Sequence, residues 1–188
     1  MRRLIPSLTI LLLLGLSGCA TSSSYYVLSV AQKPKTVYSG YHNVIGVEKI
    51  SVPNYLYKRE IAIAESSSKI TLLGNALWGE DLDVGLTSRL IGYLQKKFNQ
   101  PDVYAYPWGI DRQPELKVSV QITRFIAQGN QVYLDATWRI ENMRTKKSKA
   151  RLFSTSVHTK QDPQSIVSAM NQAFAQFEEN VAIGIKNF

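Results

Sequence analysis

Cysteine and histidine are scarce in this 188-residue sequence, which contains one cysteine and two histidines. A single cysteine cannot form an intramolecular disulfide or a cysteine-rich metal site, so packing must hold the fold. His42 and His158 lie in unrelated segments and give no support for a metal cluster or a Ser-His-Asp triad. Nucleophile-elbow, phosphate-loop and H-E-x-x-H motifs are also missing. We therefore expect no enzymatic activity, no cofactor and no metal ion.

The apolar run near the N-terminus is too short to cross a membrane. It covers residues 8–16 and follows two arginines, whereas a spanning helix needs about 20 residues. A basic start and a short apolar run are typical of a secretory signal peptide. Its end, Leu16-Ser17-Gly18-Cys19, resembles the lipobox of bacterial lipoproteins, in which the cysteine is joined to diacylglycerol and N-acylated. The alternative is an ordinary signal peptide with an unrelated cysteine.

This pattern predicts a signal peptide at residues 1–18, a lipidated tether at residues 19–24 and a folded domain at residues 25–188. Cys19 is the predicted lipid anchor, outside the cytoplasm. Fully stretched, at about 3.5 Å per residue, the small polar residues 20–24 span under roughly 20 Å. The domain is therefore expected to lie close to its membrane.

The charge balance is basic, with 22 Lys and Arg residues, 14 Asp and Glu residues and a formal net charge of +8. This excess favours an anionic lipid surface, near which each cation contributes about 1 kcal/mol. The alternative is that it only supports solubility. Nucleic acid is not an expected partner, because the predicted compartment argues against it.

Alternating apolar and β-branched residues predict strands in both halves of the domain. The predicted strands cover residues 25–30, 44–50, 61–64, 70–73, 116–122, 132–140 and 151–159. The pair at residues 61–64 and 70–73 is expected to form a short hairpin.

Two apolar stripes predict long amphipathic helices, one after the strands of each half. The stripes are Leu82, Leu86, Leu90, Leu94 and Phe98, and Ile166, Met170, Phe174, Phe177, Val181 and Ile185. Asp162 and Pro163 suit the N-cap and first residue of the second helix. The order of elements predicts an α/β (α+β-like) single domain: a mixed, largely antiparallel sheet with two long amphipathic helices packed on it.

Charged residues lie at both ends of the first predicted helix. Glu80, Asp81 and Asp83 stand at its start, and Lys96 and Lys97 stand at its end. This arrangement complements the helix dipole, which we favour over a catalytic carboxylate pair.

Basic residues gather around the tip of a predicted hairpin in the second half. They are Arg139, Arg144, Lys146, Lys147, Lys149 and Arg151, with Glu141 as the only acid among them. One interpretation is a solvated turn that protects a sheet edge from aggregation. The other is a contact with lipid headgroups or an acidic partner surface, for which Lys146, Lys147 and Lys149 are candidates.

Aromatic residues flank two prolines in segments expected to be loops. They are Tyr55 and Tyr57 after Pro53, and Tyr104, Tyr106 and Trp108 around Pro107. Tyr and Trp in loops suit interfaces, because each is apolar with one polar end. Tyr55, Tyr57 and Trp108 are therefore candidate contacts with a partner or with lipid, although some of these aromatics must belong to the core.

Three segments resemble the ABC-type transport auxiliary lipoproteins, the PqiC-like family, in their order and spacing. Tyr25-Tyr26-Val27-Leu28 is similar to the Y-Y-x-L opening of that family. Residues 47–56 are similar to its V-x-x-V-x-V-P-x-Y-L segment, and residues 75–82 to its N-x-x-W-x-x-x-L segment. The resemblance covers residues 19–188, while the basic run at residues 139–151 matches none of these motifs.

The resemblance implies an outer-membrane lipoprotein of a Gram-negative envelope, without catalytic residues. The implied partners are an MCE-domain protein, which forms a hydrophobic conduit across the periplasm, and an integral membrane component of the same lipid-transport system. The implied role is a docking platform for the distal end of that conduit. A homo-oligomer is also implied, and a ring would match a symmetric tube end.

Sorting to the outer membrane is expected from Ala20, the residue after the lipidated cysteine. By the general rule for such lipoproteins, Asp at this position would retain the protein in the inner membrane. Two other classes stay open: a lipoprotein that activates or scaffolds an enzyme of peptidoglycan or lipopolysaccharide assembly, and a periplasmic hydrolase.

Overall fold

The computed structural model describes residues 22–107 and 113–188. Their regular elements follow in chain order as strands, one 3₁₀ helix and two α-helices. The elements are β1 (Ser24–Tyr26), β2 (Ile45–Glu48), η2 (Asn54–Tyr57), β3 (Glu60–Ala64), β4 (Ile70–Trp78), α2 (Leu82–Phe98), β5 (Val103–Tyr106), β6 (Leu116–Gln128), β7 (Gln131–Asn142), β8 (Ser148–His158) and α3 (Pro163–Lys186). The predicted fold class is confirmed.

The strands of the described residues form one mixed sheet of eight strands, built around the long strand β6. On one side β6 pairs with β7, and β7 pairs with β8, all antiparallel. On its other side β6 pairs in parallel with β2 near its start and with β3 near its end. The antiparallel pairings are the longest, whereas the pairs β2–β5 and β1–β4 are short and parallel.

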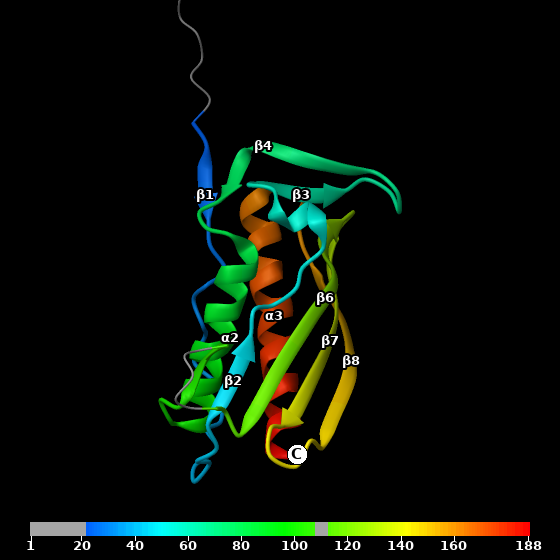
Figure 1. The fold of residues 1–188 in the computed structure, drawn as a ribbon. Coiled ribbons are helices and arrows are strands. Elements are labelled where there is room, and N and C mark those ends of the chain that lie inside the picture. Colours follow the sequence, from blue (N-terminus) through cyan, green and yellow to red (C-terminus); the bar gives the residue numbers. More distant parts are fainter. Residues whose placement is uncertain (1–21, 108–112) are drawn as a thin grey trace, which may run out of the picture.

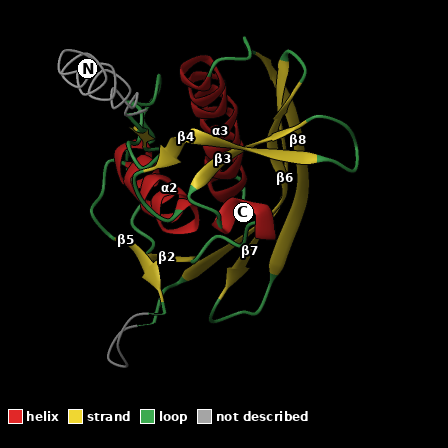
Figure 2. Ribbon diagram, turned by 90° about the horizontal axis from the view of Figure 1, so that it is seen from above, coloured by secondary structure: helices red, strands yellow, loops and turns green. Residues whose placement is uncertain are grey.

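Both helices cover the same face of this sheet. Figure 1 and Figure 2 show α3 against β6, β7 and β8, and α2 beside it against β2 and β5. The β3–β4 hairpin lies across one end of the molecule, next to β1 (Figure 1). Among the described residues, no helix combines the length and apolar character needed to cross a membrane.

The core contains the apolar stripes that the sequence predicts. Every member of the two helical stripes is buried, and so are the inward residues of β7 from Val132 to Ile140. In β6 the alternation changes phase at a bulge between Ile122 and Arg124, which turns Phe125 toward the core. The core therefore follows local periodicity, except at this β6 bulge and at a register shift between Glu60 and Ile61 in the β3–β4 pairing, neither of which the pattern predicts.

Close packing brings α3 directly onto β7. Trp138 is buried, and its ring faces Gly184: a Cβ added at that glycine would lie 2.3 Å from the Trp138 ring. The indole Nε1 of Trp138 donates to Oδ1 of Asn180 at 2.8 Å, so the buried ring keeps a hydrogen-bond partner.

Several predicted segments differ from the structure. The segment after Pro53, expected as a loop, contains the 3₁₀ helix η2, and the predicted strand 70–73 is the first part of the longer strand β4. Residues 27–30 extend past the three-residue strand β1 without pairing in the sheet, and Val103–Tyr106, expected as a loop, is the parallel strand β5. A short parallel strand depends on a partner distant in sequence, so local pattern indicates it poorly.

Candidate functional site

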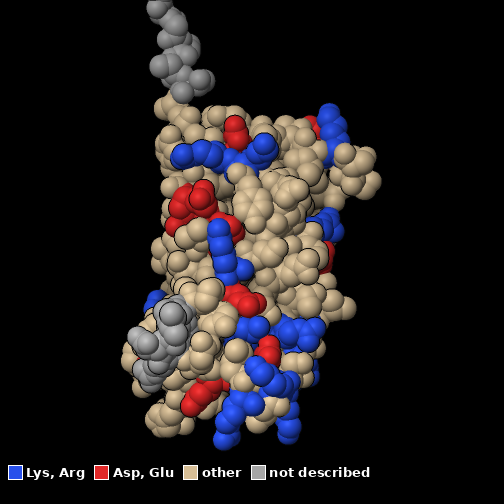
Figure 3. Space-filling view, in the orientation of Figure 1, with Lys and Arg blue, Asp and Glu red and all other residues tan. Residues whose placement is uncertain are grey.

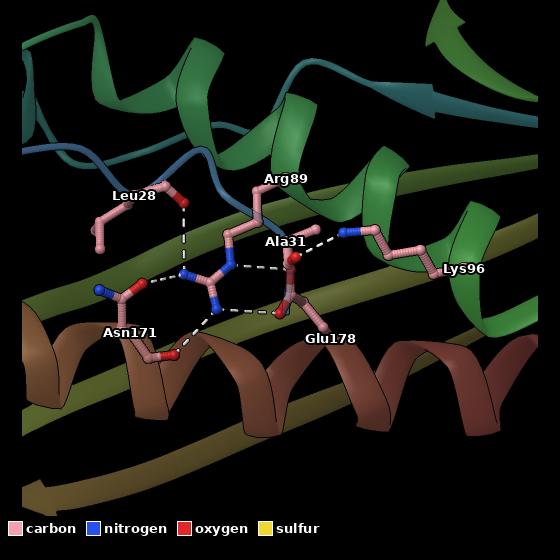
Figure 4. Close-up of polar contacts among 6 residues, drawn as sticks. All are labelled: Leu28, Ala31, Arg89, Lys96, Asn171 and Glu178. Atoms are coloured by element: carbon pink, nitrogen blue, oxygen red, sulfur yellow. Dashed lines mark hydrogen bonds and ion pairs between the residues drawn. The ribbon is translucent and has the colours of Figure 1, made fainter. Parts of the chain in front are cut away.

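Arg89 and Glu178 form an ion pair in the interior, between the two helices (Figure 4). Both side chains are fully buried. The contact is bidentate, with Nε 3.0 Å from Oε1 and Nη2 3.2 Å from Oε2. The other Arg89 donors reach Oδ1 and the carbonyl of Asn171, at 2.6 and 3.0 Å, and the carbonyl of Leu28 at 3.4 Å. Acceptors from two chain segments, α3 and the N-terminal segment that contains Leu28, therefore satisfy the buried guanidinium.

A second ion pair, between Lys97 and Glu179, lies two turns farther along α2. Lys97 Nζ is 2.8 Å from Glu179 Oε1 and 2.8 Å from Thr36 Oγ1. It also lies 4.4 Å from the centre of the Tyr38 ring, a cation–π distance. The hydroxyl of Tyr93 donates to the other Glu179 oxygen.

The two neighbouring glutamates of α3 have different electrostatic environments. Burial raises the pKa of the Glu178 carboxyl to about 7, although Arg89 acts in the opposite direction. Burial also acts to raise the pKa of Glu179, but hydrogen bonds from Lys97 and Tyr93 hold it below its ordinary value. Burial and the bond to Glu179 raise the pKa of Tyr93. Glu178 is thus the carboxyl whose charge depends most directly on its arginine partner.

These contacts fasten the N-terminal segment, residues 27–38, along α2. Leu28 is 1% exposed, and its carbonyl accepts from Arg89. The ammonium of Lys96 donates to the carbonyl of Ala31 at 2.7 Å (Figure 4), and the backbone N–H of Tyr38 donates to the carbonyl of Lys97 at 2.7 Å. The chain that leads toward the predicted anchor is therefore part of the folded body.

Neither ion pair is predicted from the sequence. Lys97 lies in the last turn of α2, as expected, but it is buried and paired rather than exposed at the helix end. A signal existed, because Arg89, Tyr93 and Lys97 recur every four residues beside the leucine stripe. Glu178 follows Phe174 at the same spacing. Periodicity alone does not show that these charges face each other across two helices.

The acidic residues at the start of α2 have structural contacts. Asp83 is 2% exposed, and its carboxylate lies 2.7 Å from Lys49 Nζ and accepts the backbone N–H of Val84 at 2.7 Å. Its hydrogen bond raises the pKa of Lys49. Asp81 occupies the N-cap position without a side-chain capping bond. In residues 22–107 and 113–188, no three His, Cys, Asp or Glu side chains come together as a metal site.

The predicted basic hairpin is confirmed as the turn between β7 and β8, here called the basic turn (residues 143–147). Figure 3 shows Lys and Arg gathered at this end of the molecule, opposite the end that carries β1. Lys146 adopts a left-handed backbone, with φ of 61°, and its Nζ lies 3.9 Å from Glu141. Lys149 donates to the carbonyl of Asn187 at 3.2 Å. Lys147 is exposed, so the basic turn presents positive charge to solvent.

The aromatic candidates fall on separate elements. Tyr55 and Tyr57 lie in the 3₁₀ helix η2, where Tyr55 is half-buried and Tyr57 is 56% exposed. The hydroxyl of Tyr55 accepts the backbone N–H of Phe125 at 3.0 Å, beside the β6 bulge, and burial raises the pKa of that hydroxyl. Tyr57 therefore has the more accessible ring, whereas Tyr55 also supports the sheet.

The remaining candidates are distributed between β5 and the undescribed segments. Tyr104 and Tyr106 belong to β5, and the hydroxyl of Tyr104 donates to Asp102 at 2.9 Å. Cys19, Ala20 and Trp108 lie outside the described residues, so their roles stay predictions.

Replacing Tyr55 with phenylalanine tests its structural role. Because the change leaves the Phe125 N–H without its acceptor, we expect a loss of about 1–3 kcal/mol in the free energy of unfolding. Tyr57→Phe, at an exposed ring in the same η2, is the control and should change stability by less than about 0.5 kcal/mol. Urea denaturation of the two variants measures the difference, and equal stabilities would contradict the role assigned to Tyr55.

Comparison with known proteins assigns the chain to a family. The model of the ABC-type transport auxiliary lipoprotein component matches residues 26–182, and the chain belongs to this family. Among curated relatives, it is similar to the intermembrane transport lipoprotein PqiC of Escherichia coli, with 28% identity over 121 residues. That match spans 64% of this chain and 64% of PqiC, slightly under two thirds of the relative's length.

Solved structures share the fold. A protein from Xanthomonas campestris superposes with a TM-score of 0.72 at 14% identity, covering 85% of this chain and 93% of that one. A crystal structure of an uncharacterized protein gives a TM-score of 0.70 at 23% identity, covering 87% of this chain and 99% of the other. At these identities the similarity concerns the fold alone.

Proposed function

We propose that this protein is an outer-membrane lipoprotein of an MCE-type intermembrane lipid-transport system. In this role it acts as a non-catalytic docking platform for the periplasmic MCE protein and receives the distal end of its conduit. The family match over residues 26–182 carries the proposal. The name of PqiC, an intermembrane transport lipoprotein, supports the same role here.

The proposed anchoring follows from the sequence. A signal peptide at residues 1–18 is removed, Cys19 carries diacylglycerol and an N-acyl chain, and residues 19–24 form the tether of the domain at residues 25–188. Ala20 permits sorting to the outer membrane, so that the domain faces the periplasm. An integral membrane component would complete the system, and a homo-oligomer would provide a symmetric platform.

Docking is assigned to the surface that extends away from the anchor. The basic turn, with Lys146 and Lys147, and the adjacent Lys149 in β8 suit an acidic surface of the MCE protein. Tyr57, which is exposed on η2 next to the β3–β4 hairpin, is a separate candidate aromatic contact, and Trp108, outside the described residues, is another. Tyr55 stays a candidate as well, although its hydroxyl already supports β6. Opposite charges across such an interface increase the association rate and specificity.

Charge reversal at the basic turn tests the docking role. The variant Lys146→Glu, Lys147→Glu, Lys149→Glu is expected to bind the MCE protein at least about tenfold more weakly at low salt, which corresponds to 1.4 kcal/mol. Affinity capture of the tagged full chain from native membranes, with quantitative mass spectrometry, measures the loss.

A matched control changes the same charge elsewhere. Lys33→Glu, Lys35→Glu, Lys160→Glu alters exposed lysines outside the basic turn and should retain the partner. Raised salt should weaken capture by the unmodified chain, because exposed charges are screened. Equal capture by both variants would remove the basic turn from the docking surface, and capture of no MCE protein by the unmodified chain would overturn the proposed function.

A further inference from the structure

The end of the molecule next to the predicted anchor is defined by β1 and the β3–β4 hairpin. The first described residue is Ser22, and Ser24 in β1 pairs with Ala76 of β4. Residues 20–24 can extend under roughly 20 Å at about 3.5 Å per residue. If Cys19 is lipidated, the bilayer therefore lies within that distance of β1.

The chain cannot swing freely at this end, because β1 and the following residues are held on the fold. The backbone N–H of Gly79 donates to the carbonyl of Tyr26 at 2.8 Å, and Leu28 is buried beneath Arg89. The direction in which the chain enters β1 at Ser24 is thus set by the fold.

Large apolar side chains are exposed at the same end. Tyr25 in β1 is 63% exposed, and Ile70 and Leu72 in β4 are 44% and 40% exposed. Ala64 and Ala62 stand opposite Ile70 and Leu72 in the hairpin register, so these four residues share one apolar face. Figure 1 and Figure 2 show the hairpin lying across this end of the molecule.

The opposite end has a different surface. The α3 helix has 24 residues and is about 36 Å long at 1.5 Å per residue. Its first turn contributes Ile166 to a groove shared with Ile63 and Ala64 of the hairpin, whereas its C-terminal Asn187 contacts Lys149 near the basic turn. The apolar hairpin face and the basic turn are thus at opposite ends of the longest element.

We infer that Tyr25, Ile70 and Leu72 rest against the bilayer that holds the anchor, and that the basic turn points away from it. The inference rests on the lipid anchor of the proposed function. Aromatic and aliphatic side chains gain from entering the headgroup boundary, where tyrosine keeps its hydroxyl in water. Because the chain between Cys19 and β1 is short, this bilayer, rather than another surface, covers the apolar side chains at this end. The basic turn is then left for a partner on the periplasmic side.

A single-thiol fluorescence experiment tests this placement. Cys19 is the only cysteine and is consumed by lipidation, so Leu72→Cys and Lys147→Cys each provide one site for an environment-sensitive dye. Both positions are exposed in the fold. The lipidated chains are reconstituted in vesicles of phosphatidylethanolamine and phosphatidylglycerol, with and without lipids that carry a nitroxide on the headgroup.

The nitroxide lipids are expected to quench the dye at position 72 and to leave the dye at position 147 at its unquenched intensity. Vesicle flotation is recorded in parallel. Chains that float but are quenched equally at both positions, or at neither, would overturn the placement alone. If the dye at position 72 becomes protected from quenching as the protein concentration rises, this face is covered by a second copy of the chain. That result would also overturn the placement against the bilayer. Chains that do not float would overturn the anchor and this placement together.

Discussion

Replacing Arg89 with methionine is expected to lower the free energy of unfolding by about 3–5 kcal/mol, because it leaves Glu178 buried without its partner. The variant also removes the donors to Asn171 and Leu28, which join α3 and the N-terminal segment to α2. Urea denaturation of the purified chain at pH 7 measures the loss. A decrease below about 1 kcal/mol would contradict the role of this ion pair.

The double variant Arg89→Met, Glu178→Met is the matched control. Replacing a whole buried ion pair by apolar residues of similar size is often neutral or stabilising, whereas breaking it from one side is costly. We therefore expect the double variant to be more stable than the single variant. If the two are equally unstable, the loss comes from packing or from the other Arg89 contacts rather than from the unpaired carboxylate.

The stability deficit of Arg89→Met should also depend on pH. Burial raises the pKa of Glu178 from its ordinary 4.5 to about 7, and removal of Arg89 eliminates the interaction that opposes this rise. A carboxyl with a raised pKa in the folded state contributes stability that is fully present below its unfolded pKa. That contribution is lost as pH rises through the folded pKa. The deficit should therefore grow between pH 5 and pH 8, and a deficit that shrinks over this range would refute the assignment.

Truncation of Phe174 is expected to have an effect of similar size. This residue is 0% exposed. The centre of its ring lies 5.5 Å from the ring centre of Phe177 and 6.3 Å from that of Phe125. The Cζ atom of Arg89 stands 5.1 Å from the Phe174 ring centre. Phe174→Ala removes a ring that joins α3, β6 and the buried ion pair. The expected loss is about 3–5 kcal/mol, a large part of a typical total of about 5–15 kcal/mol.

The same helix offers a control for Phe174→Ala. Ile183 is 42% exposed on α3, so Ile183→Ala keeps the helix and removes an apolar side chain outside the core. We expect this control to change stability by less than about 1 kcal/mol, since surface substitutions have small effects. Thermal and urea unfolding of the two variants compare them, and equal losses would show that burial at position 174 is not what stabilises this face.

Some features of the candidate surfaces depend only on residues close together in the sequence, and these features were predictable. The basic turn is a hairpin, as its flanking alternation indicates, and Asp162 caps α3 through a hydrogen bond of 2.8 Å from the backbone N–H of Ser165. By contrast, the distinct roles of Tyr55 and Tyr57 could not be predicted. They depend on whether a hydroxyl meets the β6 bulge, which is remote in sequence.

By itself, the sequence determined the two helices, most strands, their buried faces and the segments that resemble the family, because these follow from spacing within a few residues. Only the tertiary structure decided that β5 pairs with β2, that Arg89 meets Glu178 and Lys97 meets Glu179, and that the basic turn lies opposite β1. Each of these depends on contacts between segments far apart in the chain. Such contacts arise when whole elements pack and bury their surfaces, and local periodicity carries no information about which distant element will be the partner.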